Sequence, residues 1–158
     1  MQRSSHGENK WAEAQPLYAK AEHLFEVQNQ PSEALYAQVG ALAIKLHHYE
    51  LATRAEGEQG IATFLLGDVD TAKKQVVRAW GLSKVEYDPA ATVRYASDFG
   101  AGLVQIQRFK EAMTFLNQAI NVASSTKGVA FPTIAVYAKI DALVDLHQYD
   151  EALGLASQ

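Results

Sequence analysis

The chain has 158 residues, 48% of them apolar, so it is long enough to bury one sizeable hydrophobic core. Its 14 basic and 18 acidic residues are interspersed and give a formal net charge of −4, which argues against nucleic acid or an anionic membrane surface as a partner. It has no cysteine, which excludes disulfides and thiolate metal sites. No apolar stretch reaches the roughly 18 residues of a membrane span. Residues 1–8 lack the apolar core of a signal peptide, and we expect a disordered or expression-derived tail there.

Abundant alanine and only four prolines predict helices rather than strands. Pro16 opens or kinks the first helix, and Asp68 or Asp70 caps the fourth. Asp88-Pro89 begins the fifth helix, and Pro132 opens the seventh. We expect turns near residues 30, 67, 107 and 147. The eight predicted helices cover, in chain order, about 9 or 15 to 28, 32–46, 50–66, 69 or 71 to 84, 89–106, 109–124, 132–146 and 149–158.

The strongest pattern is a turn sequence that recurs about every 40 residues. Each copy has a bulky apolar residue three places before an alanine: Val69 and Ala72, Phe109 and Ala112, Tyr149 and Ala152. Apolar residues three and four apart give each helix a stripe that must pack on its neighbours. Such a period indicates an all-α solenoid of four helical hairpins. Small residues, notably Gly100, Ala112 and Ala119, are expected to be buried at helix crossings.

The residues at these positions resemble a known family. Phe99-Gly100-x-x-Leu103 followed by Ala112-x-x-x-Leu116-x-x-Ala119 is similar to the tetratricopeptide repeat, and Gly60 with Ala72-x-x-x-Val76-x-x-Ala79 matches in the same register. The resemblance implies an antiparallel helical-hairpin superhelix over residues 9–158, as a fragment of a longer protein. The period of 40 departs from the family's period of about 34. The stretch Arg54–Gly67 and the loop into Phe131-Pro132 are also similar to long bacterial members, some of which carry a CHAT peptidase domain; no peptidase motif lies in this chain.

The repeat slips in the first third of the chain. Val39-Gly40 reads as part of a first helix and Tyr49-x-x-Ala52 as part of a second, yet Gly60 places that same helix first in the next repeat. Two interpretations stay open: one helix serves two roles, or a segment has been lost between about Ala43 and Glu50.

No residue cluster indicates catalysis or metal binding. The five histidines include only one adjacent pair, His47 and His48, and we expect all five on loops and the surface. No phosphate-binding loop or nucleophile motif is present. The acidic pairs Glu56 and Glu58, and Asp141 and Asp145, are expected on solvated faces. We therefore expect no enzymatic activity, no metal and no cofactor. Large aromatic residues are expected to fill helix crossings, although they could also anchor a partner: Trp11, Trp80 and Tyr95.

The family register implies a concave groove lined by the first helix of each hairpin. The predicted groove residues are Arg54, Glu58, Ile61 and Leu65 on the third helix, Arg94, Asp98, Ala101 and Gln105 on the fifth, and Tyr137, Asp141 and Asp145 on the seventh. Family members that grip a chain terminus carry a lysine, arginine and asparagine cluster there, which this chain lacks. An acidic chain terminus is therefore not expected as the ligand.

The sequence leaves two functions open. The first is a scaffold that binds an extended or helical segment of another protein in the groove. The second is a ligand- or peptide-sensing regulatory domain of a larger bacterial signalling or peptidase protein. We also expect self-association through the C-terminal hairpin, residues 134–156, whose apolar face has little cover. The compartment stays open, with the cytoplasm as the expectation.

Overall fold

The structure is a computed structural model that describes residues 12, 14–23, 33–86 and 88–157. Every regular element in these residues is a helix, which confirms the all-α prediction. The helices form two compact units, residues 1–88 (unit 1) and residues 89–158 (unit 2). The predicted tail, Trp11 and the predicted turn near residue 30 lie outside the described residues. Within the described ranges, no helix is both long and apolar enough to cross a bilayer.

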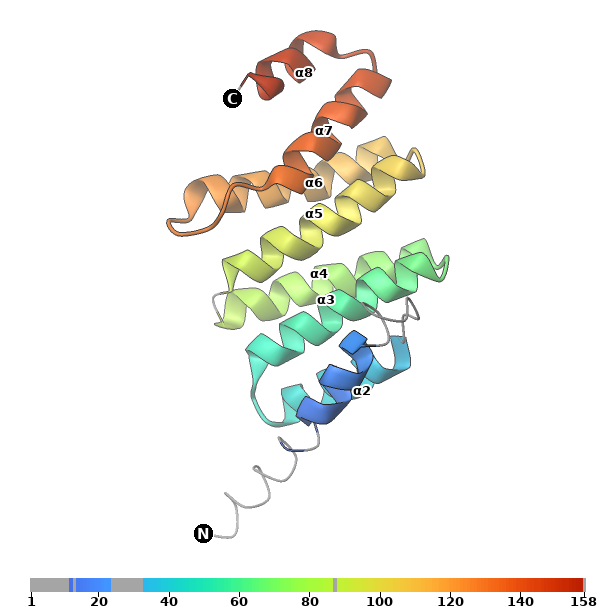
Figure 1. Ribbon diagram of the computed structural model, residues 1–158, viewed down its shortest axis with the longest axis vertical. Coiled ribbons are helices and arrows are strands. Elements are labelled where there is room, and N and C mark those ends of the chain that lie inside the picture. Colours follow the sequence, from blue (N-terminus) through green and yellow to red (C-terminus); the bar gives the residue numbers. More distant parts are fainter. Residues whose placement is uncertain (1–11, 13, 24–32, 87, 158) are drawn as a thin grey trace. The chain divides into compact units, whose positions relative to one another are not determined.

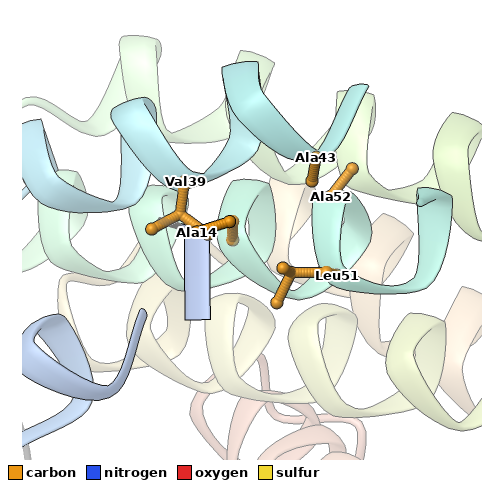
Figure 2. Close-up of a cluster of buried hydrophobic side chains, with 6 residues drawn as sticks. Ala14, Val39, Ala43, Leu51 and Ala52 are labelled. Carbon is orange, nitrogen blue, oxygen red and sulfur yellow. The ribbon is translucent and has the colours of Figure 1, made fainter. Parts of the chain in front are cut away.

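Unit 1 contains a helical segment at residues 14–23, followed by α2 (Glu33–Lys45), α3 (Tyr49–Leu65) and α4 (Val69–Glu86). Figure 1 shows α2, α3 and α4 in succession, and α3 packs against both α2 and α4. Segment 14–23, α2 and α3 converge on one apolar cluster, drawn in Figure 2. Its buried members are Ala14, Val39, Ala43, Leu51, Ala52 and Ala55. Four of the six are alanines, so these helices approach closely.

Unit 2 contains α5 (Pro89–Gln105), α6 (Phe109–Ser125), α7 (Thr133–Asp145) and α8 (Tyr149–Ala156). α7 packs against α5, α6 and α8. The buried rings of Phe99 on α5 and Phe115 on α6 meet edge to face, with centroids 4.7 Å apart. This geometry is the one that aromatic quadrupoles favour, and it fixes α6 against α5.

The same turn connects helices at four places. Before α4, the Gly67 backbone takes φ +100°; its N–H donates to the Phe64 carbonyl, and the Asp68 N–H donates to the Thr63 carbonyl. This pair of bonds is a Schellman motif, which satisfies carbonyls that a helix end leaves open. The same bonds recur at three further residues with positive φ: His47, Gln107 and His147. The predicted turns near residues 67, 107 and 147 are therefore confirmed.

Glycines on one helix face larger side chains on the next, sixteen residues later. A methyl group on Gly60 would lie 2.7 Å from Cγ2 of Val76, and one on Gly100 would lie 2.6 Å from Cδ2 of Leu116. Gly40 faces Glu56 in the same register, with more room. The predicted burial of Gly100, Ala112 and Ala119 is confirmed. Small residues at these places let the helices approach until the facing side chain fills the space.

α3 belongs to two helix pairs at once. The Schellman turn at His47 precedes it, and the turn at Gly67 ends it. α3 packs against both α2 and α4, a contact pattern that either interpretation of the slipped repeat allows.

The helix signals in the sequence hold to within a residue or two. Asp68 caps α4: the Thr71 N–H donates to Asp68 Oδ1 at 3.2 Å, and the Thr71 hydroxyl donates to Oδ2 at 2.7 Å. α5 begins at Pro89 as predicted, whereas Pro132 lies one residue before α7, at its N-cap. Both prolines occupy places where a missing N–H costs no hydrogen bond.

Candidate functional site

In unit 2, the predicted groove residues form two stripes on helices that contact each other. On α5, steps of four, three and four residues place Arg94, Asp98, Ala101 and Gln105 on one face; Arg94 and Gln105 are exposed, and the other two are half-buried. On α7, Tyr137, Asp141 and Asp145 are all exposed. Because α5 packs against α7, the two stripes supply one unit with an aromatic side chain and charges of both signs.

Tyr137 is the aromatic side chain of the α7 stripe, and 66% of its surface is exposed. Ile134, one turn earlier on the same face, is 53% exposed. Exposure of large apolar side chains to water is unfavourable, and burial of the same surface against a partner would lower the free energy.

Two features shape the charge on α5. Burial raises the pKa of Asp98, and the neighbouring Arg94 partly counteracts this rise. The Arg94 guanidinium lies 5.5 Å from the ring centroid of buried Tyr95, within the range of a cation–π contact. The ring therefore holds the Arg94 side chain along the helix surface.

The predicted groove residues of α3 have different surroundings from one another. Arg54 is exposed and pairs with Glu50 one turn earlier at 2.8 Å, while Leu65 is exposed and Ile61 half-buried. Glu58 is only 6% exposed. Its charge acts on Tyr36, whose hydroxyl donates to Glu22 at 2.8 Å. Burial first, then Glu22 and Glu58, raises the pKa of Tyr36.

The expectation that Glu56 and Glu58 lie on a solvated face is wrong. The Glu56 side chain is 12% exposed, and Glu58 is buried. The cause is the packing of both α2 and α4 against α3, which leaves few of its positions in contact with water. One signal could have revealed Glu56, because it follows Gly40 by the sixteen residues that separate Gly60 from Val76.

Two histidines occupy turns and contact a nearby tyrosine. His47 and His147 adopt positive φ in exposed turns, and Nδ1 of each lies within hydrogen-bond distance of the tyrosine hydroxyl two residues on, at 3.2 Å for Tyr49 and 2.6 Å for Tyr149. His48 Nδ1 accepts from the Leu51 N–H and caps α3. The described part of the chain contains no group of three or more histidine, aspartate or glutamate side chains placed to hold a metal ion.

The large aromatic residues differ in their burial. Tyr95 is 1% exposed and fills the interior of unit 2 as expected. Trp80 is half-buried, which leaves part of its ring at the surface of unit 1.

Comparisons with known proteins give no match: no family model, no curated protein and no solved structure is similar to this chain.

Proposed function

We propose that the protein is a scaffold of stacked helical hairpins, similar to tetratricopeptide repeats, that binds an extended or helical segment of another protein. The observation that carries this proposal is the α7 stripe, in which exposed Tyr137 is followed on the same face by Asp141 and Asp145. Tyrosine is enriched among the residues that contribute most to binding energy at protein interfaces, and polar and charged groups surround such anchors at the rim.

The neighbouring helix supplies the complementary groups. Arg94 and Gln105 are exposed on α5, which packs against α7. A bound segment would place an apolar side chain against Tyr137 and polar side chains against the charges on either side. Mixed charge on this surface favours a partner segment that carries both signs.

The proposal is tested by selecting peptides from a display library on the immobilised protein and measuring their Kd by fluorescence anisotropy. Tyr137→Ala is expected to weaken binding at least about fivefold, because truncating an aromatic anchor costs more than about 1 kcal/mol. Tyr149→Ala is the matched control, since Tyr149 is also an exposed tyrosine, 52% accessible, but lies on α8. Equal losses in the two variants, or a library that yields no specific peptide, would refute the proposal.

A further inference from the structure

A cavity of about 370 Å³ that is open to solvent lies in unit 1, lined by residues of α2, α3 and α4. Its size falls within the range of small-molecule sites. α2 contributes apolar side chains, α3 contributes a carboxylate and an amide, and α4 contributes mostly polar or basic groups. The lining residues are Ala37, Ala41 and Ile44; Glu56 and Gln59; and Thr71, Lys74, Gln75 and Arg78.

Glu56 occupies a place that the fold fills elsewhere with an apolar side chain. The residues that face Gly60 and Gly100 are Val76 and Leu116, both fully buried, whereas the residue that faces Gly40 is Glu56. Its carboxylate Oε1 is 3.2 Å from Nε of Arg78. A charged group at a helix crossing costs desolvation energy that valine or leucine would not. Packing therefore does not account for this carboxylate.

Two further features of α4, beside the cavity, are also unfavourable for the folded protein. Lys74 and Arg78 are four residues apart on one helix face, a like-charge spacing that destabilises an isolated helix. The Gln75 carboxamide oxygen is buried and has no hydrogen-bond partner.

Together these groups complement a molecule with two opposite charges. Glu56 offers an acceptor for an ammonium group, Lys74 and Arg78 offer donors for a carboxylate, and the α2 wall is apolar. A simple cation would meet the two basic side chains, and a simple anion would meet Glu56. We propose that this cavity binds a small zwitterion of amino-acid size. The site lies in unit 1, so it is independent of the segment-binding surface proposed for unit 2.

The proposed orientation places the ligand ammonium at Glu56 and the ligand carboxylate at Arg78 and Lys74. An aliphatic side chain then packs against Ala37, Ala41 and Ile44. Arg78 can serve both carboxylates, because its guanidinium has five N–H donors and its Nε lies 3.2 Å from Oε1 of Glu56.

The test uses ¹⁵N-labelled protein titrated with each standard L-amino acid in turn, at up to about 10 mM, enough to detect a millimolar Kd. We expect saturable shifts of the amide resonances of Ala41, Lys74 and Gln75 with at least one aliphatic amino acid. The N-acetyl derivative, which lacks the ammonium, and the amide derivative, which lacks the carboxylate, should each bind at least about tenfold more weakly. Absence of shifts with every amino acid, or equal binding of the blocked derivatives, would overturn the proposal.

Three variants locate the site. Glu56→Gln and Arg78→Gln are expected to weaken binding at least about tenfold, whereas Arg54→Gln, which removes an exposed and ion-paired arginine outside the cavity, is expected to bind as the parent does. Glu56→Leu restores an apolar residue at the glycine-facing position, so it should fold and lose binding. If Glu56→Leu binds normally, the proposed ammonium site is wrong. If Arg54→Gln binds as weakly as Arg78→Gln, the assignment to this cavity is wrong.

Discussion

Gly100 and Leu116 are in contact so close that a methyl group on the glycine would lie 2.6 Å from Cδ2 and 2.8 Å from Cγ of the leucine. No real side chain tolerates such distances, so a larger residue at position 100 must displace the Leu116 side chain or push α6 away from α5. The hydrophobic core of unit 2 depends on this approach, because Phe99 and Phe115 meet beside it.

Gly100→Ala is therefore expected to destabilise the protein. Overpacking of a core costs about 1–3 kcal/mol, which outweighs the roughly 0.5–1 kcal/mol that alanine gains over glycine within a helix. Gly81→Ala is the matched control, because a methyl group there would meet nothing within 4 Å; it should stabilise the protein by about 0.5–1 kcal/mol. Urea unfolding of both variants measures the difference. A Gly100→Ala protein as stable as the control would show that the two helices are not this close.

Two substitutions in equivalent turns are expected to change stability in opposite directions. Gln107 adopts φ +64°, a conformation that costs a non-glycine residue about 1 kcal/mol or more. Gln107→Gly is expected to stabilise the protein by up to about 1 kcal/mol, and Gly67→Ala, at φ +100°, to destabilise it by a similar amount or more. Thermal unfolding of the two variants checks the signs. Changes in the same direction would contradict the shared turn geometry.

Glu56 should make stability fall as pH rises. Burial raises its pKa above the ordinary 4.5, and Arg78 only partly opposes this. The folded protein then binds the proton more tightly than the unfolded chain does. The resulting penalty is absent below pH 4.5 and fully present above the raised pKa. Glu56→Gln is expected to raise the free energy of unfolding at pH 7 and to have less effect near pH 4, as measured by urea titration. A larger effect at the lower pH would contradict the burial of this carboxylate.

Asp68 should show the opposite pH dependence. Its hydrogen bonds from the Thr71 hydroxyl and then the Thr71 N–H lower its pKa below the ordinary 3.8. The stabilisation is therefore present above that value and is lost as pH falls through the lowered pKa. Asp68→Ala is expected to lower the unfolding midpoint at pH 7 and to have a smaller effect near pH 2. Asp70→Ala is the control, because Asp70 lies two residues later in the first turn of α4, whereas the cap bonds to Thr71 are made by Asp68. A loss at pH 7 as large in Asp70→Ala would assign the effect to helix charge rather than to the cap.

The last two helices, α7 and α8, expose several large apolar side chains, and we expect the chain to self-associate through them. Leu153 on α8 is 67% exposed, and Tyr137 and Ile134 on α7 are exposed to a similar degree. We expect a concentration-dependent increase in mass by light scattering, which Leu153→Glu should abolish. Leu65→Glu, in unit 1 and 56% exposed, is the matched control and should leave the association unchanged. A parent protein that stays monomeric at all concentrations would exclude this interface.

The helices and turns could be predicted from the sequence because local signals determine them. Proline at position 89, glycine at position 67 and alanines such as Ala72 and Ala112 each have a local physical reason to be where they are. The surroundings of Glu56 and Glu58 could not be predicted in this way. Whether those carboxylates meet water depends on which helices cover α3, and one helix sequence does not contain that information. Likewise, Glu22 and Tyr36 meet only through packing of two separate helices.

The spacing of the turns has a consequence for the length of the chain. His47 and Gly67 both adopt positive φ in the same kind of turn and are twenty residues apart. Gly40 and Gly60, the glycines that face the next helix, are also twenty residues apart. Excision of residues 48–67 would join His47 to Asp68 and leave Gly40 sixteen positions before Val76, the spacing that Gly60 has now. α4 would then take over the place of α3. Between residues 40 and 76 the repeating unit is thus a single helix with its turn, twenty residues long, whereas the later turns at Gly67, Gln107 and His147 recur every forty residues.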